Sequence, residues 1–245
     1  MDTQPYGNVI VDAADGEALD DSFGTAAVRR RVLDAWAASP ARFREDANAE
    51  EDAARGAYRD RLVVELLQNA VDAAHAAGVG CRVLMTLTSD RNPNDDNHGG
   101  DGRGGDGHGS RGGMLEIANT GMALSAPGVE SLSTLRASAK RDTAALGRFG
   151  VGFAAVLAVS DTPSIVSRDV QVTAGMPAGS RGVRWSKQET IDAIGALGVP
   201  ALDAELARRD GAVPVLRLPS PVVDAVPPPD GYDTVVRLPL RDVDA

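Results

Sequence analysis

The sequence predicts an α+β fold, a two-layer sandwich in which a mixed β-sheet is covered on one face by helices. Helical and strand patterns follow one another without the regular alternation that a doubly wound parallel sheet requires. Two neighbouring strand patterns are also placed to pair as a hairpin. With 245 residues, 43% of them hydrophobic, the chain has room for one large domain or two small ones and for a sizeable core.

The first 59 residues predict an N-terminal extension whose helices pack on the main domain, residues 60–245. After an extended start, residues 25–39 have helical periodicity, which Pro40 stops. A second helical pattern, polar and then apolar, runs from about residue 41 to 77, with Gly56 as the expected break.

A β-hairpin is predicted next in the chain. Residues 81–88 and 114–119 alternate well enough for strands. Residues 89–113, between them, are rich in Gly, Asp, Asn and His and contain almost no apolar side chain. Such a segment cannot offset its ordering entropy by burial, so we expect a disordered hairpin tip.

The remaining elements are predicted from periodicity and from turn residues. Helices are expected at 127–135, 149–159, 188–197 and 202–209. Strands are expected at 164–167, 182–185, 213–218 and 234–240. A proline-rich loop, 219–229, separates the last two strands.

Charge and cysteine content narrow the classes of function. The net charge of −10 argues against a broad nucleic-acid interface, so we expect no nucleic-acid partner. Cys81 has no second cysteine, the N-terminus has acidic residues where a signal peptide would be apolar, and no apolar run reaches membrane-spanning length. We therefore expect a cytoplasmic protein with no membrane partner. Any anion site is therefore expected to be local, and residues 131–150, with four basic residues and one acidic residue, fit one.

A polar stripe on the 60–77 helix is the first chemical signal. Glu65, Asn69 and Asp72 fall at about 0°, 40° and −20° around the helix axis. A carboxylate there could orient a water, and an amide oxygen could ligate Mg²⁺, which takes few protein ligands. An ordinary amphipathic helix explains the stripe equally well, since Arg61 and Gln68 extend it toward solvent.

Two glycine-containing segments are the second and third signals. Asn119-Thr-Gly121 ends a predicted strand in a turn, which by itself is weak. Gly147, Gly150 and Gly152 precede an apolar helical pattern that begins with Phe153. Glycines let backbone N–H groups approach a phosphate, and the following helix start adds positive potential.

In this order the three segments resemble the GHKL superfamily of ATP-binding domains, known as the Bergerat fold. The likeness covers roughly residues 60–240. The run GRFGVGF is most similar to the glycine motif of heat-shock chaperones, and LRASAKR with Asn-Thr-Gly is similar to the ATP-binding domain of sacsin-type proteins. The resemblance implies a chaperone-like ATPase that binds ATP and Mg²⁺ and acts with protein clients or downstream domains.

The resemblance also implies a role for each matching residue. Glu65 would be catalytic by activating water, Asn69 would bind Mg²⁺, and Asp72 would steady the ribose-phosphate side. Asn119 would face the adenine amino group and Gly121 would admit the base. The other implied nucleotide-binding residues are Lys140 in a mobile lid at residues 124–146, the phosphate-binding Gly147, Gly150 and Gly152, Phe153, and Thr234 at the adenine site.

Two residues depart from the family pattern. Asn119 stands where Asp is usual, which removes a charge-assisted hydrogen bond worth on the order of 1 kcal/mol and leaves the choice between adenine and guanine open. Asp233 stands where a glycine usually precedes the late threonine. Slow ATP hydrolysis is the expected function, and a nucleotide sensor without useful turnover is the alternative. A histidine kinase is disfavoured, since such kinases usually carry Asn at the position of Glu65.

Overall fold

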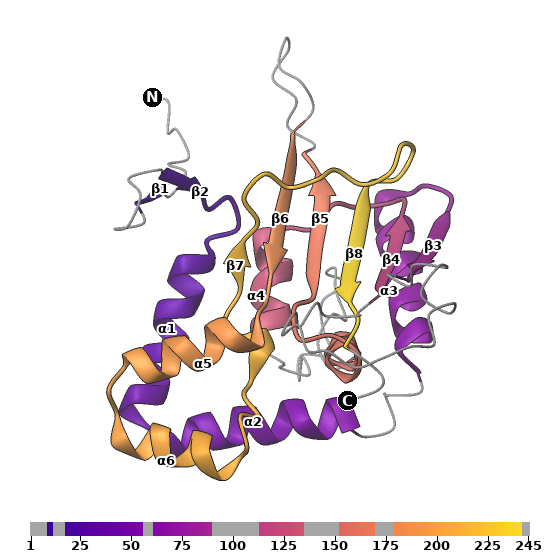
Figure 1. The fold of residues 1–245 in the computed structure, drawn as a ribbon. Coiled ribbons are helices and arrows are strands. Elements are labelled where there is room, and N and C mark those ends of the chain that lie inside the picture. Colours follow the sequence, from indigo (N-terminus) through magenta and orange to yellow (C-terminus); the bar gives the residue numbers. More distant parts are fainter. Residues whose placement is uncertain are drawn as a thin grey trace, which may run out of the picture.

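The computed structural model describes residues 9–11, 18–55, 61–89, 113–134, 152–169 and 179–241. A six-stranded sheet forms one layer and helices form the other (Figure 1). In spatial order the strands are β3 (Val83–Thr88), β4 (Met114–Asn119), β8 (Thr234–Pro239), β5 (Ser164–Arg168), β6 (Ser180–Arg184) and β7 (Ser220–Pro221). Two short strands, β1 (Val9–Val11) and β2 (Ala18–Asp20), pair with each other.

The predicted α+β class is confirmed. The last strand in the chain, β8, inserts between β4 and β5, so it joins the β3–β4 hairpin to the β5–β6 hairpin. Every pairing between the described strands of this sheet is antiparallel. We expected a mixed sheet with parallel and antiparallel pairs. The described strands instead alternate in direction, because β8 runs antiparallel to both of the hairpin strands it joins.

The helices gather on one face and one end of the sheet (Figure 1). They are α1 (Thr25–Ala38), α2 (Pro40–Arg55), α3 (Leu62–Ala77), α4 (Ala126–Thr134), α5 (Lys187–Ala196) and α6 (Pro200–Arg208). Two short 3₁₀ helices are η3 (Phe153–Ala158) and η4 (Val215–Arg217). None of the helices in the described ranges is long and apolar enough to cross a membrane.

Local sequence signals explain several helix ends. The Asp21 carboxylate accepts hydrogen bonds from the backbone N–H of Thr25 (2.6 Å) and of Ala26 (3.0 Å), and so caps α1. The α2 helix begins at Pro40, where a missing N–H costs nothing. The α3 helix ends at Gly78, whose left-handed φ of 66° suits glycine.

Two predicted elements are corrected by the structure. The helix expected at 149–159 is the 3₁₀ helix η3, a tighter turn whose residues 153–157 are all buried; residues 149–151 lie outside the described chain. The strand expected at 213–218 is η4 and its flanks. The backbone N–H of Leu216 donates to the buried Glu50 carboxylate (3.1 Å) instead of to a strand partner. A short, wholly buried apolar run does not reveal by its periodicity which element it forms.

Side chains of the central strands separate into two faces. The row that faces the helices consists of Ile117, Val236, Ile165 and Val183, which are register neighbours on β4, β8, β5 and β6. The next row, Ala118, Val235 and Val166, faces the other way and packs against Ala225 of the proline-rich loop and against Tyr232, which follows this loop. The helices thus cover one face, and the main core lies beneath them.

The two N-terminal helices share this core. Trp36 of α1 and Phe43 of α2 are fully buried, with ring centroids 5.3 Å apart in an edge-to-face arrangement. Both belong to the same cluster as Ile117 and Phe153. The structure thus includes α1 and α2 in the packing of the main domain.

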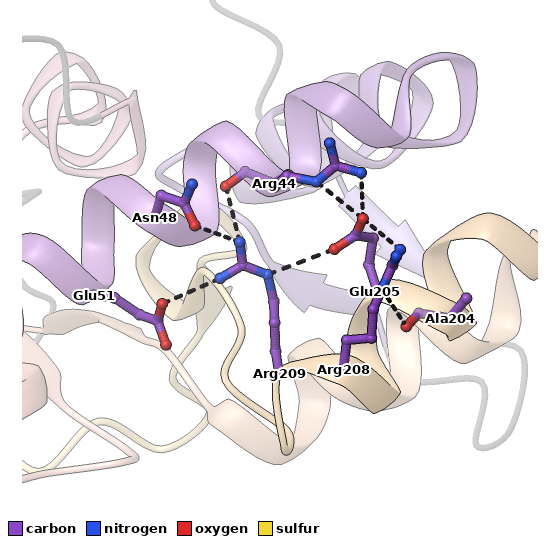
Figure 2. A network of polar contacts seen from close by, with 7 residues as sticks. All are labelled: Arg44, Asn48, Glu51, Ala204, Glu205, Arg208 and Arg209. Atoms are coloured by element: carbon purple, nitrogen blue, oxygen red, sulfur yellow. Dashed lines mark hydrogen bonds and ion pairs between the residues drawn. The ribbon is translucent and has the colours of Figure 1, made fainter.

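A polar network joins α2 to α6 (Figure 2). The buried Glu205 carboxylate accepts hydrogen bonds from Arg44 and from Arg208 (2.6 Å), and Arg209 contacts Glu51 (3.2 Å) and Asn48. Hydrogen bonding to Arg44 lowers the pKa of the Glu205 carboxyl. The network fixes α6 across the middle of α2.

Candidate functional site

A pocket lies between α3, α4 and the helix-facing side of the sheet. Together with the solvent at its open mouth, the pocket holds about 880 Å³ of space. Apolar side chains make most of its wall. Its lining residues are Leu66, Asn69, Asp72, Ala73, Ala76, Ile117, Asn119, Met122, Ala123, Leu124, Ser125, Gly128, Phe153, Ile165, Thr234 and Val236.

The α3 helix supplies the polar wall. Leu62, Leu66, Ala70 and Ala74 recur every fourth residue and are buried, which fixes the rotation of the helix against the core. That rotation directs Asn69 and Asp72 into the pocket. Asn69 is half-buried and Asp72 is exposed, so an amide oxygen and a carboxylate line the side nearer to solvent. One amide ligand suits a Mg²⁺ ion that keeps waters or phosphate oxygens as its other ligands.

The sheet supplies a short row of polar groups at one end of an apolar floor. Asn119, Thr234 and Ser167 are register neighbours on β4, β8 and β5. The Ser167 Oγ accepts a hydrogen bond from the Leu124 N–H (3.0 Å) and lies 2.8 Å from Thr234 Oγ1. Since each hydroxyl has one proton, this pair keeps one O–H free to donate.

Asn119 is oriented by its own turn. Its side chain is buried, and its Nδ2 donates to the Thr120 carbonyl oxygen (3.1 Å). One N–H of the Asn119 amide is engaged, so its side-chain oxygen can accept a hydrogen bond within the pocket and its second N–H can donate one. This end, the inner end of the pocket, therefore offers an amide and a hydroxyl donor next to apolar walls.

Gly121 lies where the turn meets α3. Its φ is 135°, and a Cβ at this position would be 2.5 Å from the carbonyl carbon of Ala73 and from the nitrogen of Ala74. The next residue, Met122, donates its N–H to the Ala73 oxygen (3.0 Å). The close approach that Gly121 permits is to the α3 backbone, and Gly121 does not itself line the pocket.

Glu65 and Gly152 meet one helical turn before Asn69. A Cβ on Gly152 would overlap the Glu65 carboxylate and would lie 2.9 Å from its Cδ. Glu65 is half-buried and is not part of the pocket lining. The structure thus brings the first and third predicted motifs into contact, with the carboxylate directly against the last glycine.

Phe153 follows this glycine and lines the pocket. Its ring is buried and lies 5.6 Å from the ring of Trp185, centroid to centroid. The predicted Lys140, Gly147 and Gly150, and residues 135–146 of the predicted lid, lie outside the described residues. Residues 124, 125 and 128 of the predicted lid line the pocket, as do residues 122 and 123 just before it.

A buried charge network supports α4 from behind. The Arg217 guanidinium donates to the Ser133 carbonyl oxygen (3.1 Å) near the end of α4 and pairs with Asp46 of α2 (3.2 Å). Glu50 lies 3.8 Å from the Arg217 Nε. Burial raises the pKa of Glu50 to about 8, against the opposing effect of Arg217, and burial also lowers the pKa of Arg217.

Sequence reasoning did not identify Ser167 as part of the site. It assigned residues 124–128 to a mobile lid and did not predict that residues 124, 125 and 128 line the pocket. Ser167 gave no signal by itself, because its role depends on β5 pairing with β8, 67 residues later. Comparison with known proteins adds no assignment: neither protein-family models nor curated proteins include a match to this chain.

Proposed function

We propose that this chain is a Mg²⁺-ATP-binding domain of the GHKL type that hydrolyses ATP slowly as part of a chaperone-like protein. The observation that carries the proposal is convergence. Asn69, Asp72, Asn119, Phe153 and Thr234 come from four separate segments and line one pocket. Each of them is a residue for which the sequence resemblance implies nucleotide binding.

The polar groups of the pocket suit the two ends of a nucleotide. At the inner end, the Asn119 side-chain oxygen can accept from an adenine amino group, and the Thr234–Ser167 pair can donate to a ring nitrogen. Apolar residues such as Ile117, Ile165 and Met122 suit the faces of a base. On α3, Asn69 would hold the metal, whose bound form neutralises phosphate charge.

Glu65 supports hydrolysis over simple binding. It lies one turn before Asn69 and against Gly152, the described end of the glycine segment. A carboxylate placed beyond the metal would orient the attacking water, a contribution of roughly 10²–10⁴-fold to a rate. The competing proposal, a nucleotide sensor without useful turnover, rests on Asn119, whose neutral amide holds the base less firmly than a carboxylate.

Two variants separate binding from hydrolysis, with isothermal titration and a phosphate-release assay as the readouts. Glu65→Ala is expected to bind Mg²⁺-ATP within a few-fold of wild type and to release no phosphate. Asn69→Ala is expected to lose the Mg²⁺-dependent part of the affinity. A wild type that binds neither ATP nor ADP refutes the proposed function, and one that binds ATP without turnover favours the sensor. Unfolding of Glu65→Ala would mean that the polar stripe is structural.

A further inference from the structure

We propose that Asp233 is a positioning residue that holds Asn119 in place at the inner end of the pocket, an inference that rests on the nucleotide-binding function proposed above. Asp233 immediately precedes β8 and is half-buried. It does not line the pocket, so it acts through its neighbours.

Asp233 forms hydrogen bonds to both ends of the turn that carries Asn119. Its Oδ2 accepts a hydrogen bond from the Gly121 N–H (2.8 Å), and its backbone N–H donates to the backbone oxygen of Asn119 (2.9 Å). A hydrogen bond to a carboxylate is about twice as strong as one between neutral groups. Thr120 lies between the two bonded residues. Its backbone oxygen accepts a hydrogen bond from the Asn119 side-chain amide and so orients that amide.

The opposite side of the turn is held by residues 80–82, the segment that precedes β3. Thr120 donates its N–H to the Arg82 oxygen (3.1 Å), and its Oγ1 donates to the Gly80 oxygen (2.9 Å) and accepts from the Arg82 N–H (2.9 Å). The turn is thus held by hydrogen bonds on two sides. Asp233 holds the side next to β8, where Thr234 pairs with Asn119.

Asp233 is itself held in place. Its carbonyl oxygen accepts from the Arg168 N–H (2.8 Å), and the Arg168 Nε donates to the Tyr232 oxygen (2.8 Å). These bonds fix the backbone on both sides of the carboxylate. A carboxylate that is already oriented loses little entropy when it binds the Gly121 N–H.

The same contacts account for a departure noted in the sequence. The position of Asp233 is usually glycine in the family that the chain resembles, and glycine has no side chain to accept the Gly121 N–H. Asn119 is the other departure, and the two residues are joined by a hydrogen bond in the same turn. We infer that the neutral Asn119 amide, which binds a base less firmly than a carboxylate, depends on Asp233 for its fixed orientation.

The test compares three variants by isothermal titration with ATP, GTP and adenosine. Asp233→Ala removes the acceptor and is expected to weaken ATP and adenosine by about tenfold, and to narrow the preference for ATP over GTP. Asp233→Asn keeps an oxygen acceptor and is expected to stay within about threefold of wild type. Asp230→Ala is the matched control, since Asp230 lies in the same loop, is fully exposed and pairs with Arg168 at 3.4 Å.

The readouts separate positioning from a merely structural role. If Asp233→Ala binds all three ligands as wild type does, the inference is overturned while the nucleotide-binding function stands. It is also overturned if Asp233→Ala weakens ATP and GTP equally, melts at a lower temperature and is not rescued by Asp233→Asn. If the wild type itself binds neither ATP nor adenosine, the proposed function has failed, and the base-positioning role fails with it.

Discussion

The contact between Gly152 and Glu65 determines which positions the Glu65 carboxylate, predicted to be catalytic, can occupy. Gly152→Ala adds a methyl group where the Glu65 carboxylate now lies, and a flexible side chain gives way more easily than backbone. We expect Mg²⁺-ATP affinity within a few-fold of wild type and a phosphate-release rate lower by roughly 10²-fold or more. Gly195→Ala is the control, because a Cβ there meets no atom within 4 Å. Equal phosphate-release rates for Gly152→Ala and wild type would contradict a catalytic role for Glu65.

Asn119 carries the prediction on base selectivity. Asn119→Asp introduces a charged acceptor at the buried Asn119 position, so ATP should bind several-fold more tightly. Titration of the parent and the variant with ATP and GTP measures both affinity and preference. A parent that prefers GTP, together with unchanged ATP binding in the variant, would show that Asn119 does not face an adenine amino group.

Among the elements, the β3–β4 hairpin permits a test of the long segment between its strands. Thr88 and Met114 are paired at the end of the ladder, so the two strands can be joined by a short turn. We expect replacement of residues 89–113 by a Gly-Ser turn to preserve cooperative melting and ATP affinity. Loss of either property would show that this segment contributes to the folded domain or to the site.

The α2–η4 contact gives the stability of the protein a pH dependence. The pKa of Glu50 is about 8 in the folded protein and 4.5 when unfolded, so between these values the folded state holds the extra proton. Its contribution to stability therefore falls as pH rises from about 5 to 8. Glu50→Gln cannot titrate, and wild type should lose up to about 1.4 kcal/mol per pH unit relative to it. Denaturant melts across this range, with a constant difference between the two proteins, would contradict the assignment.

Elements with local signals were predictable, and those that depend on distant partners were not. The α3 stripe follows from the 3.6-residue period, and the β3–β4 hairpin follows from two alternating segments. Ser167 could not be placed beside Thr234, since nothing local indicates that β8 inserts between β4 and β5. The η4 segment was predicted as a strand. Nothing local indicates that its Leu216 N–H donates to the Glu50 carboxylate, 166 residues earlier.

At the scale of the whole molecule, the pocket exists only when the sheet is complete. Its walls come from α3, the β4 end and the following turn, η3, and the strands β5 and β8, so residues from 66 to 236 must assemble before it forms. The final strand closes the floor at Thr234 and Val236. Nucleotide binding and global folding should therefore be coupled, with Mg²⁺-ATP raising the melting temperature by mass action.

Hydrogen–deuterium exchange of the full chain, with and without saturating Mg²⁺-ATP, tests the central claim most directly, because it shows where a ligand acts without presupposing a residue's role. The pocket account predicts that nucleotide slows exchange in α3, in residues 117–125 and at the start of β8, and that Asn69→Ala reduces this protection. Unchanged exchange at these segments, or protection confined to α5 and α6, would contradict a nucleotide site in this pocket.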